Sequence, residues 1–323
     1  MQPLNFPLIN TKEGAAMLVV GAVFVDVKGF SSGTYLPEGT NLGDVQVSAG
    51  GVCRNVVENL ARMGFRATFL SMVDDNAMGQ DVRDGLNALG VDTTHVFTCE
   101  KGMGMWLAIL DEHGDLRGSI SRQPDFKAME RYIEENGESL MEGCDGVVLG
   151  YDTNSAITAK MLQLADRHNV PVYGVVGNMG VILRHPEYLR RSACFICNEN
   201  EAGRLFNQPV EGMSPEALLP LLVQESRNMG IPAMVITMGP EGSVYVDHRT
   251  GEFGRCPARA VNMVDSTGAG DAFFTGVVAA LNQNMPLAAA VLAGTRLAAR
   301  TLEFAGACCP DAREIFFGED VKE

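Results

Sequence analysis

Seven consecutive residues, 265–271 in the order D-S-T-G-A-G-D, combine the residue types that phosphoryl transfer requires. Gly268, Ala269 and Gly270 leave the main chain almost bare, so a ligand can reach peptide N–H groups at the start of a helix, where the helix dipole favours negative charge. Asp271 places a carboxylate beside this anion site. Because a carboxylate repels phosphate, its presence indicates a base that takes the proton of an attacking hydroxyl.

This stretch needs elements on both sides to position it. An apolar, strand-like run at 259–264 leads in, and a helical run at 272–281 leads out. A lone aspartate before a helix is most often a cap. The full combination is more specific, and it resembles the C-terminal signature of the ribokinase-like (PfkB) carbohydrate kinases. The resemblance implies that Asp271 is the catalytic base and that the amides of 268–270 form the anion hole.

A second motif of the same family lies near residue 50. Gly50 and Gly51 precede apolar residues that repeat with helical period as far as Gly64, a helix stop. A glycine pair at a helix start can also be purely structural. Together with Asn55 the pair matches the family's N-terminal signature, which implies that these three residues contact the sugar.

An aspartate earlier in the chain completes the expected acceptor site. Asp26 follows a continuous apolar run from Met17 to Val25, which is typical of a strand buried on both faces of a parallel sheet. Ligands collect outside the carboxyl ends of such strands, and the alternative is a turn aspartate. In the resembling family an aspartate in this place binds the acceptor's hydroxyls.

Two further stretches match the family's nucleotide and magnesium motifs. Thr237, Gly239 and Gly242 resemble its T-x-G-x-x-G nucleotide loop, which implies ATP as co-substrate, with Thr267 also in contact with the nucleotide.

Asn198 and Glu201 match the N-x-x-E that organises Mg²⁺ near the phosphates, and Asn198 is also assigned to the nucleotide. The same spacing is a capping box, and the two interpretations are compatible. As in some relatives, Asp265 is expected to help hold a monovalent cation such as K⁺.

Residues beside these motifs narrow the range of candidate phosphate acceptors. Arg54 stands next to Asn55, and Asp152 and Asn154 follow a middle strand. Both details are similar to pseudouridine kinases, which implies 5′-phosphorylation of pseudouridine to pseudouridine 5′-phosphate, with ribose or another nucleoside as the nearest alternative. Arg54 has a structural alternative, a salt bridge to Glu58 four residues along the helix.

The middle of the chain alternates strands and helices. The expected elements are strands at 146–151, 171–176 and 195–197 and a helix at 155–168. This alternation predicts an α/β fold with a doubly wound, mostly parallel sheet flanked by helices. We expect one ribokinase-like domain over 1–323, with two inserted segments, approximately 30–47 and 103–123, pairing as a small β-sheet lid. In the family such a lid often forms a homodimer.

Composition excludes several partner classes. The net charge is −15, so a nucleic-acid backbone would be repelled. No apolar run approaches the roughly 20 residues of a membrane span, and residues 1–16 lack the features of a signal peptide, so we expect a cytoplasmic protein. Eight scattered cysteines do not indicate a disulfide framework. Cys194 and Cys197 have metal-knuckle spacing, but an odd offset in a strand points them to opposite faces.

Other functional classes fit the sequence less well. A nicotinamide-dependent oxidoreductase needs a third glycine where Gly268-Ala269-Gly270 continues to Phe273. No P-loop motif occurs. A non-catalytic nucleoside-binding protein would keep the fold and lose the base or the anion hole, and neither is lost.

Overall fold

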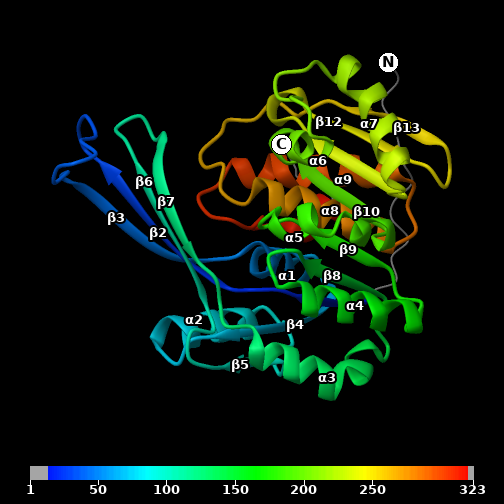
Figure 1. Ribbon diagram of the computed structural model, residues 1–323, viewed down its shortest axis with the longest axis horizontal. Coiled ribbons are helices and arrows are strands. Elements are labelled where there is room, and N and C mark those ends of the chain that lie inside the picture. The colour runs from blue at the N-terminus through cyan, green and yellow to red at the C-terminus, as the bar shows by residue number, and fades with distance from the viewer. Residues whose placement is uncertain (1–13, 319–323) are drawn as a thin grey trace.

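The computed structural model describes residues 14–318, and a nine-stranded sheet forms its centre (Figure 1). The strand order is β13-β12-β11-β10-β9-β8-β1-β4-β5. All pairs from β11 to β5 are parallel, whereas β11–β12 and β12–β13 are antiparallel. The strands are β1 Ala16–Val20, β4 Arg66–Val73, β5 Val96–Thr98, β8 Gly146–Gly150, β9 Val172–Val175, β10 Cys194–Asn198, β11 Ala233–Thr237, β12 Ser243–Asp247 and β13 Glu252–Cys256.

Helices cover both faces of this sheet. Along β1, Met17 and Val19 belong to one apolar cluster and Leu18 and Val20 to the other, because successive side chains of a strand point to opposite faces. The first cluster contains side chains of α1 Val52–Arg62, α2 Ala77–Ala88, α8 Ala269–Asn282, α9 Leu287–Leu302 and α10 Ala312–Phe317. The second contains side chains of α3 Lys127–Met141, α4 Ser155–His168, α5 Gly180–Arg184, α6 Glu199–Phe206 and α7 Pro215–Met229. The predicted doubly wound fold is confirmed.

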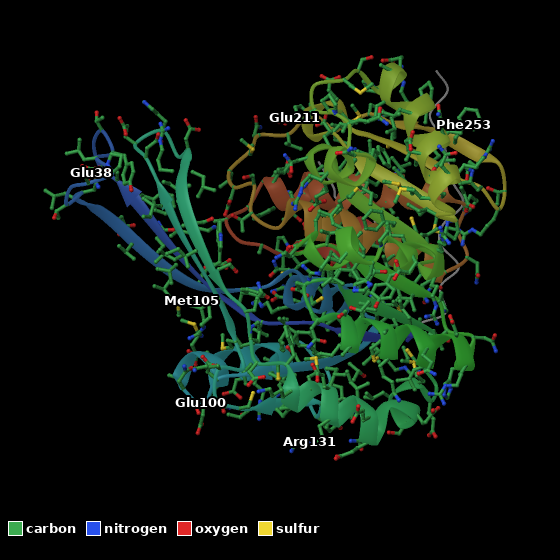
Figure 2. All side chains as sticks on the ribbon, viewed as in Figure 1. Glu38, Glu100, Met105, Arg131, Glu211 and Phe253 are labelled. Atoms are coloured by element: carbon green, nitrogen blue, oxygen red, sulfur yellow. The ribbon has the colours of Figure 1, made fainter. Side chains whose placement is uncertain are left out.

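A second, four-stranded sheet projects from the body as a lid (Figure 1). Its order is β3-β2-β6-β7, with β2 Phe24–Ser31, β3 Gly43–Gly50, β6 Gly104–Leu110 and β7 Leu116–Arg122. The outer pairs are antiparallel and β2 pairs with β6 in parallel. Glu38 lies at the far tip and Met105 where the lid joins the body (Figure 2).

The lid begins earlier than the sequence predicted, which corrects the first strand. The apolar run 17–25 is two strands: β1 ends at Val20, and Asp26 lies within the lid strand β2. The chain leaves the sheet at Gly21, where any side chain would overlap Cys53 of α1. Ala22 and Val23 remain fully buried there without pairing in the sheet. The unbroken apolar run at 17–25 correctly indicated that most of these residues are buried. A buried segment need not be a strand, however, and residues 21–23 are not.

The predicted strand at 259–264 is wrong. These residues have no regular secondary structure, and Met263 and Val264 are 68% and 65% exposed. The N–H of Val264 donates to the carbonyl of Leu302, so the segment follows the end of α9 as an extended loop. Its apolar side chains line a cavity and do not fill the core.

The strands predicted at 146–151, 171–176 and 195–197 and the helix predicted at 155–168 are confirmed within a residue or two as β8, β9, β10 and α4. Cys194 and Cys197 pack in different apolar clusters, as their odd offset predicted. Among residues 14–318 no helix is long and apolar enough to cross a membrane. The expectation for residues 1–16 falls mostly outside this range.

Candidate active site

Helix α1 begins at a glycine pair that brings it against the lid strand. Gly51, its N-cap, has φ 107°, and a Cβ there would lie 2.7 Å from the carbonyl oxygen of Ala22. A Cβ on Gly50 would overlap the carboxylate of Asp26. Both positions therefore require glycine for steric reasons, and Asp26 sits directly beside the start of α1. Partial burial raises the pKa of Asp26.

Asp271 lies in the first turn of α8 and faces α1. Asn55 donates a hydrogen bond from Nδ2 to Oδ2 of Asp271 at 2.7 Å, joining residues 216 positions apart. The pKa of Asp271 is raised to about 6, mainly by burial; the Asn55 hydrogen bond opposes the shift and the charge of Asp26 adds to it. Such a carboxylate is ionised at neutral pH and is still basic enough to accept a proton. The predicted base and the predicted sugar-binding asparagine are thus in direct contact.

A third carboxylate, Asp152, follows β8 at the same edge of the sheet. It is 8% exposed, and its Oδ1 has no hydrogen-bond partner among the described residues. Burial raises its pKa to about 6, and Asp271 adds to the shift. Side chains at Gly150 or Gly177 would crowd it. Asp26, Asp152 and Asp271 therefore converge on the start of α1, as expected of a site that holds a hydroxyl-rich ligand.

Arg54 and Asn154 have well-defined partners inside the protein. Arg54 forms the salt bridge with Glu58, at 2.8 Å, that was the structural alternative, and it also donates to Oδ1 of Asn55 at 3.1 Å. Asn154 is the N-cap of α4: it accepts from the N–H of Ile157 and donates to Glu130. A contact of either residue with the acceptor stays a prediction.

The start of α8 also lines a large cavity on its other side. Gly268, the N-cap, has φ 75°, and a side chain there would overlap the carbonyl of Ala307. Ala269 and Gly270 line a cavity of about 740 Å³, and nothing lies within 4 Å of a Cβ built on Gly270. The first N–H groups of a helix have no partner within the helix. An anion in this cavity can therefore meet peptide N–H groups while Asp271 faces the opposite side.

This cavity contains most of the predicted nucleotide residues. Thr237, Gly239 and Gly242 line it, together with the loop 258–263 and residues of α9 (Thr295, Ala298, Ala299 and Leu302). Asn198 and Thr267 are not among the lining residues. Asn198 is paired in register with Thr237 on the neighbouring strand, and Thr267 follows the lining residue Ser266.

Asn198 and Glu201 form the capping box that opens α6. Each accepts the backbone N–H of the other at 2.9 Å. The box uses Oε2 of Glu201, and burial raises the pKa of this carboxyl. An oxygen-rich pair beside Thr237 has the ligand chemistry that Mg²⁺ prefers, so these residues fit a role in its water shell.

Asp265 braces the signature loop. It accepts from the N–H of Thr267 at 2.9 Å and of Gly306 at 3.3 Å. Burial by itself would raise the pKa of Asp265. The hydrogen bonds from Thr267 and Gly306 outweigh burial and hold this pKa below its ordinary value. An ionised carboxylate at a loop fits a monovalent cation as well as a purely structural role.

Sequence reasoning missed the loop that follows α9. Ala307 packs against Gly268, and the Cys308 thiol lies 3.7 Å from the carbonyl oxygen of Asn55. The loop therefore contacts both signatures. A run of small residues, 305–307, is the signal that could have identified it.

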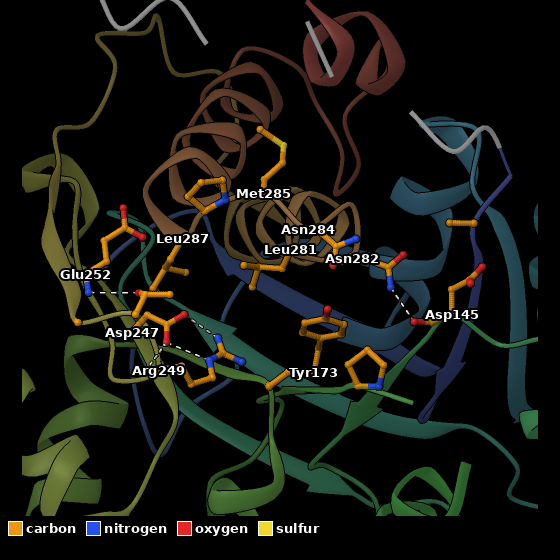
Figure 3. A pocket seen from close by; sticks show the side chains of 16 residues that line it. Asp145, Tyr173, Asp247, Arg249, Glu252, Leu281, Asn282, Asn284, Met285 and Leu287 are labelled. Carbon is orange, nitrogen blue, oxygen red and sulfur yellow. Dashed lines mark hydrogen bonds and ion pairs between the residues drawn. The ribbon is translucent and has the colours of Figure 1, made fainter. Parts of the chain in front are cut away.

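A larger cavity, about 930 Å³, lies at the opposite edge of the sheet (Figure 3). Tyr173, Arg249 and Asn282 line it, beside Asp145 at the amino end of β8. None of the predicted site residues is among its lining residues. Cavity size does not identify the site here, because the predicted site residues lie at the carboxyl ends of the strands.

Comparisons with known proteins agree with this geometry. The family model "pfkB family carbohydrate kinase" matches residues 15–312. The guanosine-inosine kinase of Exiguobacterium acetylicum is 37% identical over 285 residues, 88% of this chain and 93% of that protein. The pseudouridine kinase of Escherichia coli strain K12 is 26% identical over 285 residues, 87% of this chain and 88% of that protein.

Among solved structures, Arabidopsis thaliana ribokinase complexed with ribose and ATP matches with a TM-score of 0.81. Its sequence identity is 20%, and the match covers 94% of this chain and 97% of that one. At this identity the likeness concerns the fold alone.

Proposed function

The chain belongs to the pfkB family of carbohydrate kinases, and we propose that it transfers the γ-phosphoryl group of ATP to the 5′-hydroxyl of a nucleoside. As a member of this family it is a phosphotransferase acting on a hydroxyl of a sugar or nucleoside, and the oxidoreductase alternative is set aside. One observation carries the proposal: the start of α8 offers peptide N–H groups to one cavity while Asp271 contacts Asn55 on the other side.

The proposed reaction uses the two sides of α8 separately. Asp271 accepts the proton of the 5′-hydroxyl, whose oxygen bonds to the γ-phosphorus as the bond to the β–γ bridging oxygen breaks and ADP leaves. The N–H groups at 268–270 stabilise the negative charge on the transferring group. Asp26, Asn55 and the glycine pair hold the other hydroxyls of the acceptor.

Asn198 and Glu201 are the residues we propose for the Mg²⁺ water shell. When bound, Mg²⁺ neutralises charge on the nucleotide phosphates. For a monovalent cation we propose Asp265, whose pKa is held low by its hydrogen bonds. A rise of turnover with K⁺ at constant ionic strength would support this second assignment.

For the acceptor we propose guanosine or inosine first. The support is the 37% identity to a guanosine-inosine kinase along nearly the whole of both chains. Pseudouridine is the second candidate, supported by the 26% identical relative and by the Arg54–Asn55 pair. Arg54 and Asn154 both have partners within the protein, so they provide weaker support for pseudouridine than the sequence alone indicated.

A substrate panel tests this proposal. Purified protein with ATP and Mg²⁺ is offered guanosine, inosine, pseudouridine, uridine, adenosine and ribose, and ADP release is coupled to NADH oxidation. We expect guanosine or inosine to give the highest kcat/KM, with phosphate on the 5′-oxygen by ³¹P NMR. Highest kcat/KM for ribose, or phosphate on another oxygen, would contradict the nucleoside assignment.

We also propose that 1–323 is one domain that forms a homodimer through its lid. The strand register places Val47, Val27, Leu107 and Ile120 in one row across the four strands. Val47 and Ile120, at the two ends of this row, are 53% and 70% exposed. An apolar row on a projecting sheet is suited to pack against a second copy. A cytoplasmic location fits the eight cysteines, which are all free.

A further inference from the structure

A continuous chain of hydrogen-bonded side chains runs along α1 to the catalytic base. Arg62 donates to Oε1 of Glu58 from Nε at 2.9 Å and from its Nη2 at 2.8 Å. Oε2 of Glu58 pairs with Arg54 at 2.8 Å. Arg54 donates to Oδ1 of Asn55 at 3.1 Å, and Asn55 donates to Asp271 at 2.7 Å.

Part of this chain is unusual for a helix. Pairs four residues apart, such as Arg54–Glu58 and Glu58–Arg62, are ordinary helix ion pairs. Adjacent residues such as Arg54 and Asn55 do not normally face each other on a helix. Their hydrogen bond therefore requires Arg54 to be held in place, and Glu58 holds it. The Glu58 side chain is only 8% exposed, so its position is fixed by packing as well as by charge.

The contact between Arg54 and Asn55 decides which way the Asn55 amide points. The oxygen and nitrogen of an asparagine side chain are nearly equal in size, so its neighbours determine the orientation. Arg54 can only donate, and it therefore selects the oxygen. The NH₂ group then points at Asp271. In the flipped orientation the amide oxygen would face the carboxylate, and the two acceptors would repel each other.

We propose that Arg54, held by Glu58, is a positioning residue that orients the Asn55 amide so that it donates to the catalytic base Asp271. This inference rests on the proposed function in one respect, namely that Asp271 is the base. In this role Arg54 acts on the base through Asn55.

Several charged or titratable groups surround Asp271 and must be considered in a test. Asp26 of β2, Asp152 after β8, Cys53 of α1 and Cys308 after α9 all interact with it electrostatically. Arg54 and Arg62 both lower the pKa of the Cys308 thiol, so removing either arginine changes this group in the same direction. A hydrogen bond to the ionised carboxylate lowers its pKa, so losing the donor raises it.

The test compares Arg54→Met with Arg62→Met. Both remove an arginine of α1 that pairs with Glu58, but only the first also contacts Asn55. We expect R54M to lower kcat roughly ten- to hundredfold, the usual range for a lost hydrogen bond to a charged group. The acid limb of its kcat profile should move to higher pH, with the KM for ATP unchanged. R62M should keep the wild-type kcat and the wild-type acid limb, because Arg62 binds Oε1 of Glu58 whereas Arg54 binds Oε2.

Arg54→Lys separates orientation from charge. Lysine keeps the positive charge but lacks the fork that contacts Glu58 and Asn55 together. We expect R54K to remain impaired, and wild-type turnover in R54K would overturn the orientation argument. R54K also keeps the test decisive if R54M proves too unstable to assay.

A titration independent of turnover completes the test. Carboxyl ¹³C NMR, with Asp271→Asn used to assign the signal, measures the pKa of Asp271 in each variant. An unchanged pKa in R54M, or an equal shift in R62M, would overturn the inference. If the wild type phosphorylates no nucleoside or sugar, the proposed function fails, while the titration still tests whether Arg54 controls the Asp271 carboxylate.

Discussion

At the scale of single residues, the site depends on how one carboxylate is kept partly out of water. Burial and Asp26 raise the pKa of Asp271, and the Asn55 hydrogen bond keeps the shift moderate. The result, about 6, suits a base that works near neutral pH. The same burial that makes Asp271 basic makes its ionised form costly for the fold.

Asp271→Asn tests the base directly. We expect kcat to fall by roughly 10²–10⁴-fold, because the amide cannot take the hydroxyl proton. The cavity proposed for the nucleotide lies on the other side of α8, so ATP affinity measured by calorimetry should stay within a few-fold of wild type. Turnover close to wild type would exclude Asp271 as the base.

Asp152→Asn should separate stability from function. The pKa of Asp152 in the folded protein, about 6, lies above the ordinary value of 3.8, so ionisation is harder in the folded state. The fold therefore loses stability as pH rises from about 4 to 6, by up to about 3 kcal/mol. The variant should melt at a higher temperature than wild type at pH 7.5 and equally at pH 4. Its KM for the acceptor should rise. Equal melting temperatures at pH 7.5 would show that the buried charge carries no such cost.

At the scale of elements, two helix starts form the site. α1 and α8 meet through Asn55 and Asp271. Glycines at both starts let other segments approach closely, the β2 segment at α1 and the loop after α9 at α8. The glycines of the α8 start have different reasons to be glycine. Gly268 has φ 75° and lies against Ala307, whereas the space beside Gly270 is open.

Gly268→Ala should therefore reduce the stability of the fold, whereas Gly270→Ala should weaken ATP binding. We expect G268A to lose at least about 1–2 kcal/mol of unfolding free energy through the left-handed backbone alone, before the clash is counted. G270A should keep its stability, because alanine suits a helix. The added methyl group enters the cavity proposed for the nucleotide and should raise the KM for ATP. Chemical denaturation and steady-state kinetics measure the two effects. Equal stability loss in both variants would contradict this distinction.

At the scale of the whole molecule, the lid and the acceptor site are continuous. Asp26 belongs to β2, and β3 runs directly into the Gly50–Gly51 start of α1. Any movement of the lid therefore also displaces residues that are proposed to bind the acceptor. The cavity at the amino ends of the strands lies at the other end of α8, because Leu281 and Asn282 line it whereas Asp271 is in the first turn of that helix (Figure 3).

Val47→Lys combined with Ile120→Lys tests the proposed dimer. Two charges at the ends of the apolar row should prevent association, so light scattering should report the mass of a dimer for wild type and of one chain for the variant. Phe253→Lys is the control. Phe253 is 61% exposed, between the values for Val47 and Ile120, but it lies on β13, away from the lid. A monomeric wild type would refute the proposal.

The sequence by itself determined the layered fold and supplied most residues of the candidate site. Strands and helices alternate with clear periodicity, and the signatures at 50–55 and 265–271 carry their glycines and acids in fixed local order. Local order suffices there because a helix start presents its N–H groups whatever packs around it.

Only the tertiary structure decided which residues meet. Periodicity could not show that Asp26 belongs to the lid, because a buried loop and a buried strand look equally apolar. The run 259–264 was misjudged for the converse reason, since its apolar side chains line a cavity. The contact of Asn55 with Asp271, and the hold of Arg54 on Asn55, depend on two helix starts being brought together from distant parts of the chain. The number of residues between two positions does not give the distance between them in the folded protein. That distance is set by how the elements pack.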